Sequence, residues 1–278
     1  MPTAAVTNSP QRQSSLPLEG LEPISIWWTS LQPSLSGFAT LNHPGATGDA
    51  FGWVKAIGGA TVQMANIQIH PTAEAINHIL ITEAVRGNGA ILVNVHGQRF
   101  CNEMDTRDVV SAAILGQETG AAFLIFDQTV RKSLASIETY ANQHLLSEGT
   151  TIEALADCVG IPANTLSATV SRYNAQQKAG VDDDFGRNAT EMPASLETSP
   201  FYAVRVTPAI HHTMGGLSVN TETQGLRADG TPIPGLYAAG EVTGGLHGAN
   251  RLGGNGVADI VVNGCLAGLT ASKRLNEK

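Results

Sequence analysis

The composition of this 278-residue chain excludes several classes of protein. Apolar residues make up 42% of the chain and charged residues 14%, and the formal net charge is −8 with scattered Lys and Arg. Nucleic-acid binding needs clustered basic residues, a membrane span needs about 18 consecutive apolar residues, and three widely spaced cysteines suit neither a disulfide framework nor a zinc site. We therefore expect a cytoplasmic globular protein of two folded units, without nucleic-acid, membrane or metal partners.

The N-terminal third begins with a polar stretch and continues into regular elements. Residues 1–15 are rich in Pro, Ser, Thr and Gln, which is typical of disorder, and they lack the apolar centre of a signal peptide. Gly48-Asp49 precedes apolar residues at helical spacing, and Gly58-Gly59 ends this expected helix. Alternation from Thr61 to Ile69 then predicts a strand that ends at His70-Pro71.

The middle of the chain predicts strands that flank a helical stretch. Strands are expected at residues 90–95 and 99–100, which form a hairpin, and at residues 121–126 and 201–206. The intervening segment Asp127–Lys178 is expected to be helical, with a capping box at Thr150 and Glu153 and a second helix that starts at Pro162. The run Asp182-Asp183-Asp184 is most simply a solvated charge run, because no other metal-ligand pattern accompanies it.

The segment Gly235–Asp259, GLYAAGEVTGGLHGANRLGGNGVAD, is the most informative part of the sequence. An apolar strand leads to Glu241, a glycine-rich loop carries His247, Asn250 and Arg251, and a second glycine cluster opens an apolar helix. Glycine lets the backbone approach a ligand closely, and a helix N-terminus attracts negative charge. The segment therefore predicts a site for an anionic or oxygen-rich ligand.

Six motifs, in the same order, resemble those of the soluble fumarate reductase flavoprotein family, within the wider succinate dehydrogenase and fumarate reductase class. Besides Gly235–Asp259, they are Asn42–Asp49, Ile69–Thr72, Thr82–Gly89, Arg99–Asp108 and His211–Gly216. They cover the chain from about Leu31 to its C-terminus. Two small departures are Ala50, where the family commonly has Gly, and Gly256, where it commonly has Ala or Ser.

The resemblance implies an α/β fold with an α+β cap. Specifically, we expect part of an FAD-binding domain of the fumarate reductase and succinate dehydrogenase type, with an inserted capping domain. Residues 31–75 and 202–278 would form the C-terminal portion of the FAD-binding domain, and residues 76–201 a mobile capping domain. Residues 1–30 would be disordered or lie outside the family.

The largest departure from the family is the absence of its N-terminal dinucleotide-binding unit. Family members begin with a βαβ unit that carries G-x-G-x-x-G and binds the ADP half of FAD at a helix N-terminus. This sequence contains no such unit, so we expect a truncated flavoenzyme chain or one that borrows the missing half from another polypeptide. Exposed sheet edges and helix faces would then favour association, as a homo-oligomer or with that partner.

The residue types fit the reduction of an activated C=C bond. This reaction needs a hydride donor, groups that polarise the alkene, and an acid that protonates the other carbon. No side chain donates hydride, so a flavin is required. Arg binds carboxylates bidentately, and the charge of His adjusts near neutral pH, so both suit a dicarboxylate substrate.

The resemblance implies roles for individual catalytic residues. Arg107 matches the family's proton donor, and Glu83 and Arg86 match its proton relay, their spacing placing them on one helical face. An arginine acid conflicts with the rule that guanidinium keeps its proton. The family's answer is that a neighbouring carboxylate and a basic group reprotonate the arginine.

The resemblance also implies binding residues. His212 and Arg251 match the clamp on one substrate carboxylate, and His70 and Thr82 match the clamp on the other. For FAD, Glu241 matches the residue that holds the ribityl chain, Asp49 matches a second contact, and the backbone N–H groups of three residues would face the flavin's pyrimidine edge. These three are Asn255, Gly256 and Val257.

Each of these residues also has a structural interpretation. His70 could be a histidine satisfied within the fold, Arg107 and Asp108 could form a surface ion pair, and Thr82 and Glu83 could simply begin a helix. His211 and His96 are assigned to structure. Taken together, the motifs favour a functional origin for the site.

Three functions remain open. The first is an FAD-dependent fumarate reductase-like enzyme, and the second is a non-catalytic fragment or partner-binding module that has lost FAD. The third is a reductase of another unsaturated acid, or a steroid or aspartate oxidoreductase. The clamp residues favour a dicarboxylate substrate and so disfavour the third function. Either of the first two functions would keep every motif, so the motifs do not decide between them.

Overall fold

The computed structural model describes residues 5–6 and 24–276, which divide into two compact units. Unit 1 comprises the described residues up to Phe38 together with residues 42–68 and 210–276, and unit 2 comprises residues 39–41 and 69–209. Apart from the short segment 39–41, the chain passes between the units within two strands, β3 (Ile67–Glu74) and β7 (Phe201–Thr213). The domain boundaries expected from the sequence, near residues 75 and 202, lie close to the last residue of β3, Glu74, and the first residue of β7, Phe201.

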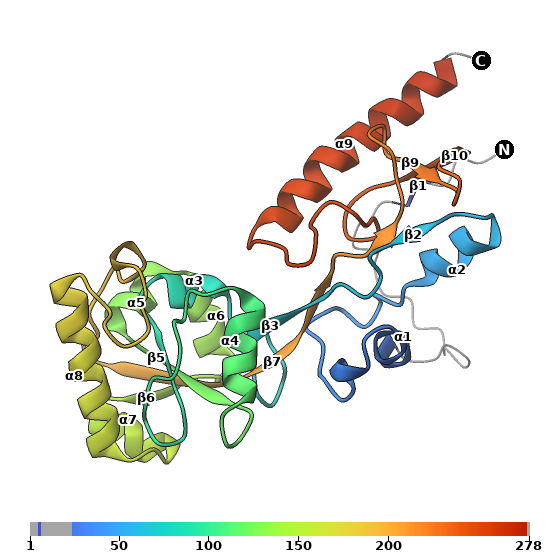
Figure 1. Cartoon of the computed structure of the whole chain (residues 1–278). Helices are drawn as coiled ribbons and strands as arrows, with labels where there is room; N and C mark the ends of the chain where they lie inside the picture. Colours follow the sequence, from blue (N-terminus) through green and yellow to red (C-terminus); the bar gives the residue numbers. More distant parts are fainter. Residues whose placement is uncertain (1–4, 7–23, 277–278) are drawn as a thin grey trace. The chain divides into compact units, whose positions relative to one another are not determined.

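Unit 1 consists of short strands and four helical segments. One sheet has the order β1 (Ala5–Val6), β10 (Pro232–Ala238), β9 (Gln224–Leu226), with β1 parallel and β9 antiparallel to β10. A second pair joins β2 (Thr61–Val62) to β8 (Gly216–Leu217). The helices are α1 (Ile24–Leu31), the 3₁₀ helix η1 (Pro33–Leu35), α2 (Asp49–Ala56) and α9 (Asn255–Asn276) (Figure 1).

Unit 2 is built on a five-stranded sheet. Its order is β3, β7, β5 (Ala122–Asp127), β4 (Ile91–Val93), and β6 (Ser147–Gly149) also pairs with β7. Helices surround this sheet (Figure 1), namely α3 (Glu83–Gly87), α4 (Arg107–Leu115), α5 (Gln128–Ser133), α6 (Ser136–Asn142), α7 (Ile152–Val159), α8 (Ala163–Ala179) and the 3₁₀ helix η2 (Ala189–Glu191). Buried apolar residues of β4, β5, β7 and these helices form one continuous core.

Helix α8 follows directly from local sequence. Pro162 precedes its first residue, and Gly180 ends it with a φ of +70°, a left-handed conformation that glycine adopts without steric cost. Leu166, Val170 and Tyr173 repeat at helical spacing and are buried against the core. The predicted helix is confirmed at both ends.

Two predictions of local structure are wrong. The expected strand from Thr61 to Ile69 is divided into β2 and β3, because Gln63 has a φ of +56°, which an extended strand cannot include. His70-Pro71 therefore lies inside β3 and not at its end, and the proline is tolerated because β3 is an edge strand. The N-cap of α7 is Thr151, whose hydroxyl accepts from Ala154 N at 3.1 Å, one residue after the predicted cap.

Two further predictions need correction. Asp182 is only 5% exposed and accepts hydrogen bonds from Arg99, so the run of three aspartates is not wholly solvated. Residues 24–30, expected to be disordered or outside the family, lie in α1. Of the rest of that segment, Ala5–Val6 forms β1, and the remaining prediction of disorder falls outside the described residues.

Helix α9 carries many large apolar side chains that are exposed in unit 1. They are Val257, Ile260, Val261, Val262, Leu269 and Leu275. Three of them are consecutive, so they point in different directions around the helix. Exposure of so many large apolar side chains on one helix favours an interface with another polypeptide segment. Even so, none of the helices in residues 24–276 combines the length and hydropathy that a membrane span requires.

Candidate active site

The predicted proton donor and its relay lie together in unit 2. Helix α3 places Glu83 and Arg86 one turn apart, and α4 begins at Arg107. Arg107 Nε donates to Glu83 Oε2 at 2.9 Å, with the Arg107 side chain 9% exposed and that of Glu83 37% exposed. Arg107 is thus a buried side chain paired with a half-exposed Glu83, whereas its alternative interpretation is a surface ion pair with Asp108.

Arg86 is held inside unit 2, and among the described residues no carboxylate bonds to its guanidinium. The residue is 1% exposed, and its Nη1 donates to the backbone carbonyl of Glu103. Burial lowers the pKa of Arg86 to about 10, a shift that the carboxylate of Glu83 opposes and the cation of Arg107 reinforces. Arg86 is thus protonated at neutral pH but releases its proton more readily than an exposed arginine.

His70 and Thr82 occupy well-defined positions in unit 2. His70 lies in β3 and is 1% exposed, and Thr72 N donates to its Nδ1 at 3.2 Å. In the neutral ring the proton therefore resides on Nε2, which makes that nitrogen the donor. Thr82 is the N-cap residue of α3, but its side chain makes no capping hydrogen bond. A role in starting the helix therefore does not explain why a hydroxyl group stands at this position.

His212 and Glu241 form a pair in unit 1. His212 Nδ1 lies 3.2 Å from Glu241 Oε2, and Thr213 N donates to Glu241 Oε1 at 3.0 Å. Burial raises the pKa of Glu241, but the contacts with His212 and Thr213 outweigh it and lower the net pKa, so the carboxylate is ionised at neutral pH. His212 is 6% exposed, and its Nε2 has no hydrogen-bond partner among the described residues, which leaves this atom for a ligand.

The glycine-rich loop of unit 1 is anchored by residues that the sequence prediction did not assign. Gln68 Nε2 donates to Asn250 Oδ1 at 2.6 Å and to the backbone oxygen of Arg251 at 2.7 Å. His247 Nε2 lies 3.2 Å from Asp259 Oδ2, and its ring meets that of His212 edge-on at 5.5 Å between centroids. His247 stood out in the glycine-rich motif, but no local signal identified Gln68, whose contacts are distant in sequence.

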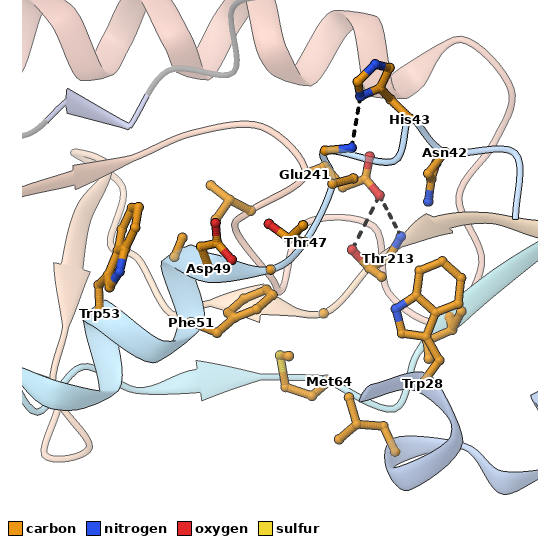
Figure 2. A pocket seen from close by; sticks show the side chains of 18 residues that line it. Trp28, Asn42, His43, Thr47, Asp49, Phe51, Trp53, Met64, Thr213 and Glu241 are labelled. Carbon is orange, nitrogen blue, oxygen red and sulfur yellow. Dashed lines mark hydrogen bonds between the residues drawn. The ribbon is translucent and has the colours of Figure 1, made fainter. Parts of the chain in front are cut away.

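A cavity of about 460 Å³ lies within unit 1, a size typical of small-molecule sites (Figure 2). Its walls include two predicted cofactor residues, Asp49 and Glu241. Figure 2 shows the hydrogen bonds between the Glu241 carboxylate and Thr213. The other lining residues combine a polar glycine-rich segment with aromatic and apolar side chains. They include Asn42, His43, Gly45, Ala46, Thr47, Gly48, Trp28, Phe51, Trp53 and Met64.

The start of α9 does not line this cavity. Asn255 N donates to Leu252 O at 3.3 Å and Val257 N donates to Gly254 O at 2.9 Å, so the turn that begins the helix uses both N–H groups. Gly256 lies against Arg251, since a Cβ atom at this position would be 3.5 Å from Arg251 Nη1. The expectation that the backbone N–H groups of Asn255, Gly256 and Val257 face a flavin stays a prediction.

The chain belongs to the FAD binding domain family, whose model matches residues 19–257. It is 49% identical over 243 residues to the fumarate reductase (cytochrome) of Shewanella frigidimarina, covering 87% of this chain and 42% of that protein. It is 38% identical over 237 residues to the urocanate reductase of Eggerthella lenta, covering 82% of this chain and 39% of that protein. The chain thus spans about two fifths of the length of these relatives.

A solved structure supports the same assignment. The open conformation of a flavocytochrome c3 fumarate reductase matches with a TM-score of 0.71 and 43% sequence identity, over 91% of this chain and 45% of that one. The predicted family and fold class are confirmed, and so is FAD as the cofactor of this family.

The cavity of unit 1 fits part of this cofactor. The ionised Glu241 and the carboxylate of Asp49 are suitable acceptors for hydroxyl groups of the ribityl chain, and aromatic walls suit a planar ring. Gly48 has a φ of +75°, which favours glycine and leaves the backbone accessible there. Asp49, Glu241 and the segment around Gly48 are therefore the residues that would hold the flavin end of FAD.

Proposed function

We propose that this chain is the substrate-binding and proton-delivering portion of an FAD-dependent fumarate reductase, which converts fumarate to succinate. The observation that carries the proposal is the 2.9 Å contact between Arg107 Nε and Glu83 Oε2, next to the buried Arg86. A proton donor must be recharged after each turnover. Glu83 can return a proton to Arg107 along this hydrogen bond, and Arg86, with its lowered pKa, suits the next step of the relay.

The reaction adds a hydride to one alkene carbon and a proton to the other. FAD, in its reduced form, supplies the hydride. Arg107 would donate the proton and become neutral, and a proton passed from Arg86 through Glu83 would restore its charge. Because guanidinium is a weak acid, the relay and the largely buried position of Arg107 are both needed for this role.

The two carboxylates of fumarate need cationic or hydrogen-bonding partners. Following the family resemblance, we assign one of them to His212 and Arg251 and the other to His70 and Thr82. Because His70 Nδ1 accepts from Thr72 N, Nε2 is the ring nitrogen that can donate, and the absence of a described partner on His212 Nε2 supports a ligand contact there. His212 is also paired with Glu241, a predicted FAD residue, so the ligand of His212 Nε2 can instead be the cofactor. Measuring both FAD binding and fumarate reduction after substitution of His212 distinguishes the two ligands.

A second polypeptide portion is part of this proposal. The relatives extend well beyond the region that they share with this chain, and the apolar residues of α9 are exposed in unit 1. We propose that a nucleotide-binding portion, in cis or in trans, covers this helix and binds the ADP half of FAD. A second copy of the chain is the alternative occupant.

Complementation tests this function directly. The chain is combined with a nucleotide-binding portion from the Shewanella frigidimarina relative, loaded with FAD, and assayed for fumarate-dependent oxidation of reduced methyl viologen. We expect succinate formation, with Arg107→Lys reducing kcat by about 10²- to 10⁴-fold. Arg251→Ala should impair both KM and kcat, because a carboxylate clamp acts in the ground state and the transition state.

The alternatives give different results in the same experiment. A complemented protein that binds FAD but does not reduce fumarate would overturn the proposal. Reduction of urocanate or another unsaturated monocarboxylate instead would favour a reductase of another unsaturated acid, which the relationship to urocanate reductase supports. A protein that forms the complex without an FAD absorbance spectrum would indicate a non-catalytic binding module.

A further inference from the structure

Unit 2 contains a buried cluster of four charged side chains that the proposed reaction does not use. Arg99 Nη2 lies 2.8 Å from Glu103 Oε2 and 2.9 Å from Asp182 Oδ2, and Arg187 Nη1 lies 3.2 Å from Glu103 Oε2. The exposure of these side chains is 0–4%. Two cations and two anions balance one another, so the cluster carries no net charge.

The cluster holds Arg86 at two points. Arg187 Nη2 donates to the backbone oxygen of Arg86 at 2.5 Å, while its Nη1 also donates to Ala90 O at 3.1 Å. At the other end, the backbone oxygen of Glu103 accepts from Arg86 Nη1. The backbone and the guanidinium of Arg86 are therefore both fixed by residues of the same cluster.

The carboxylate of Glu103 is kept away from Arg86 because its acceptor positions are already occupied. Oε1 accepts from Arg99 Nε at 2.9 Å and from Leu92 N at 3.2 Å, and Oε2 accepts from Arg99 and Arg187. A carboxylate has about four acceptor positions, so these contacts saturate it. Arg86 consequently meets a neutral carbonyl and not a charged carboxylate.

Stability alone explains this arrangement poorly. Buried ion pairs often contribute little to the free energy of unfolding, because desolvation of the charges offsets their attraction. A cluster that fixes the geometry of one further residue has a different advantage, since a misplacement of about 1 Å in an active site can cost about 10²-fold in rate.

We propose that Arg187 and Glu103 are positioning residues that hold Arg86 for proton exchange with Glu83. This role rests on the proposed function above. Glu83 of α3, Arg107 of α4 and the segment with Cys101 and Glu103 present the titratable and charged groups that face Arg86. Arg187 completes this environment by its hydrogen bond to the Arg86 carbonyl.

Arg187→Lys in the complemented holoenzyme is the first test. Lysine keeps the charge, but a single ammonium group cannot reproduce the planar fork that reaches Glu103, Ala90 and Arg86 together. We expect kcat for fumarate to fall by about 10²-fold with little change in KM. The matched control is Arg172→Lys, which alters an arginine of α8 that is 64% exposed and paired with Asp184.

A second measurement does not depend on activity. The ¹³Cζ signal of Arg86, assigned by its loss in Arg86→Lys, is followed by NMR in the 278-residue chain from about pH 8 to about pH 12. Arg187→Lys releases part of the Glu103 carboxylate, which can then approach Arg86, so the titration midpoint should rise. Glu103→Gln keeps the backbone carbonyl but removes the negative charge, so the midpoint should fall.

The outcomes separate this inference from the proposed function. Unchanged Arg86 signals in both variants, or an unchanged kcat in Arg187→Lys, would overturn the positioning role. If Arg187→Lys does not fold, Glu103→Gln decides by the direction of its midpoint. Failure of the unaltered protein to reduce fumarate would refute the proposed function, whereas the titration of Arg86 would still show whether the cluster controls it.

Discussion

Replacing Glu83 by glutamine separates a catalytic role of its contact with Arg107 from a structural one. Glutamine has nearly the same shape and keeps an oxygen that can accept from Arg107 Nε, at the position where Glu83 Oε2 lies 2.9 Å away. It cannot take up and release a proton at neutral pH. The substitution therefore preserves most of the local geometry and removes the relay function.

The two roles predict effects of different size. The Glu83 side chain is 37% exposed, so solvent screens its attraction to Arg107, and its loss should lower the free energy of unfolding by about 0–1 kcal/mol. Removal of a positioned acid–base group costs about 10²- to 10⁴-fold in rate, which corresponds to about 2.7–5.4 kcal/mol of activation free energy. The catalytic effect should thus exceed the structural one several-fold.

The assay compares kcat and KM for fumarate with the thermal unfolding of the same protein. The matched control is Glu138→Gln, which changes a carboxylate that accepts from Arg131 Nε at 2.7 Å elsewhere in unit 2. We expect Glu83→Gln to reduce kcat strongly with a small loss of Tm, and the control to leave kcat unchanged. A Glu83→Gln enzyme with undiminished kcat would refute the relay.

Three further predictions concern pH, the glycine-rich motif and α9. Since the pKa of Arg86 is about 10, kcat should decline as pH rises through this value and Arg86 loses its proton; a profile that stays flat to about pH 11 would contradict its role. Gly256→Ala places a methyl group in ordinary van der Waals contact with Arg251 and should raise the free energy of unfolding, measured by denaturant titration, by about 0.5–1 kcal/mol. A lower free energy of unfolding would show that Gly256 is required. Val261→Glu should weaken association of the chain at micromolar concentration in light scattering, because it introduces a charge into the exposed apolar surface of α9; equal masses for both proteins would exclude this surface.

Local sequence signals predicted those parts of the fold whose causes are local. The bounds of α8 follow from Pro162, Gly180 and a helical apolar repeat, all within one stretch of chain. By contrast, the break between β2 and β3 depends on the positive φ of Gln63, which alternation of residue types does not reveal. Glutamine at such a φ is uncommon, so pattern alone favoured one continuous strand.

The site shows the same division. The resemblance placed Glu83, Arg86 and Arg107 in one proton relay, and unit 2 brings Glu83 and Arg107 into contact. The burial of Asp182 could not be anticipated, because its partner Arg99 lies 83 residues earlier in the chain. Interactions at such separations are decided by tertiary packing, to which composition and periodicity are insensitive.

The route of the chain into and out of unit 2 has an evolutionary consequence. It enters by β3 and leaves by β7, which are neighbours in one sheet, and Ala75 N donates to Arg205 O at 3.0 Å near these ends. A segment whose two ends lie side by side can be replaced as a single cassette without rerouting the rest of the chain. Unit 2 carries Thr82, Glu83 and Arg107, so recombination at β3 and β7 would exchange the proposed proton donor and one of the proposed substrate clamps while the cavity of unit 1 is inherited unchanged.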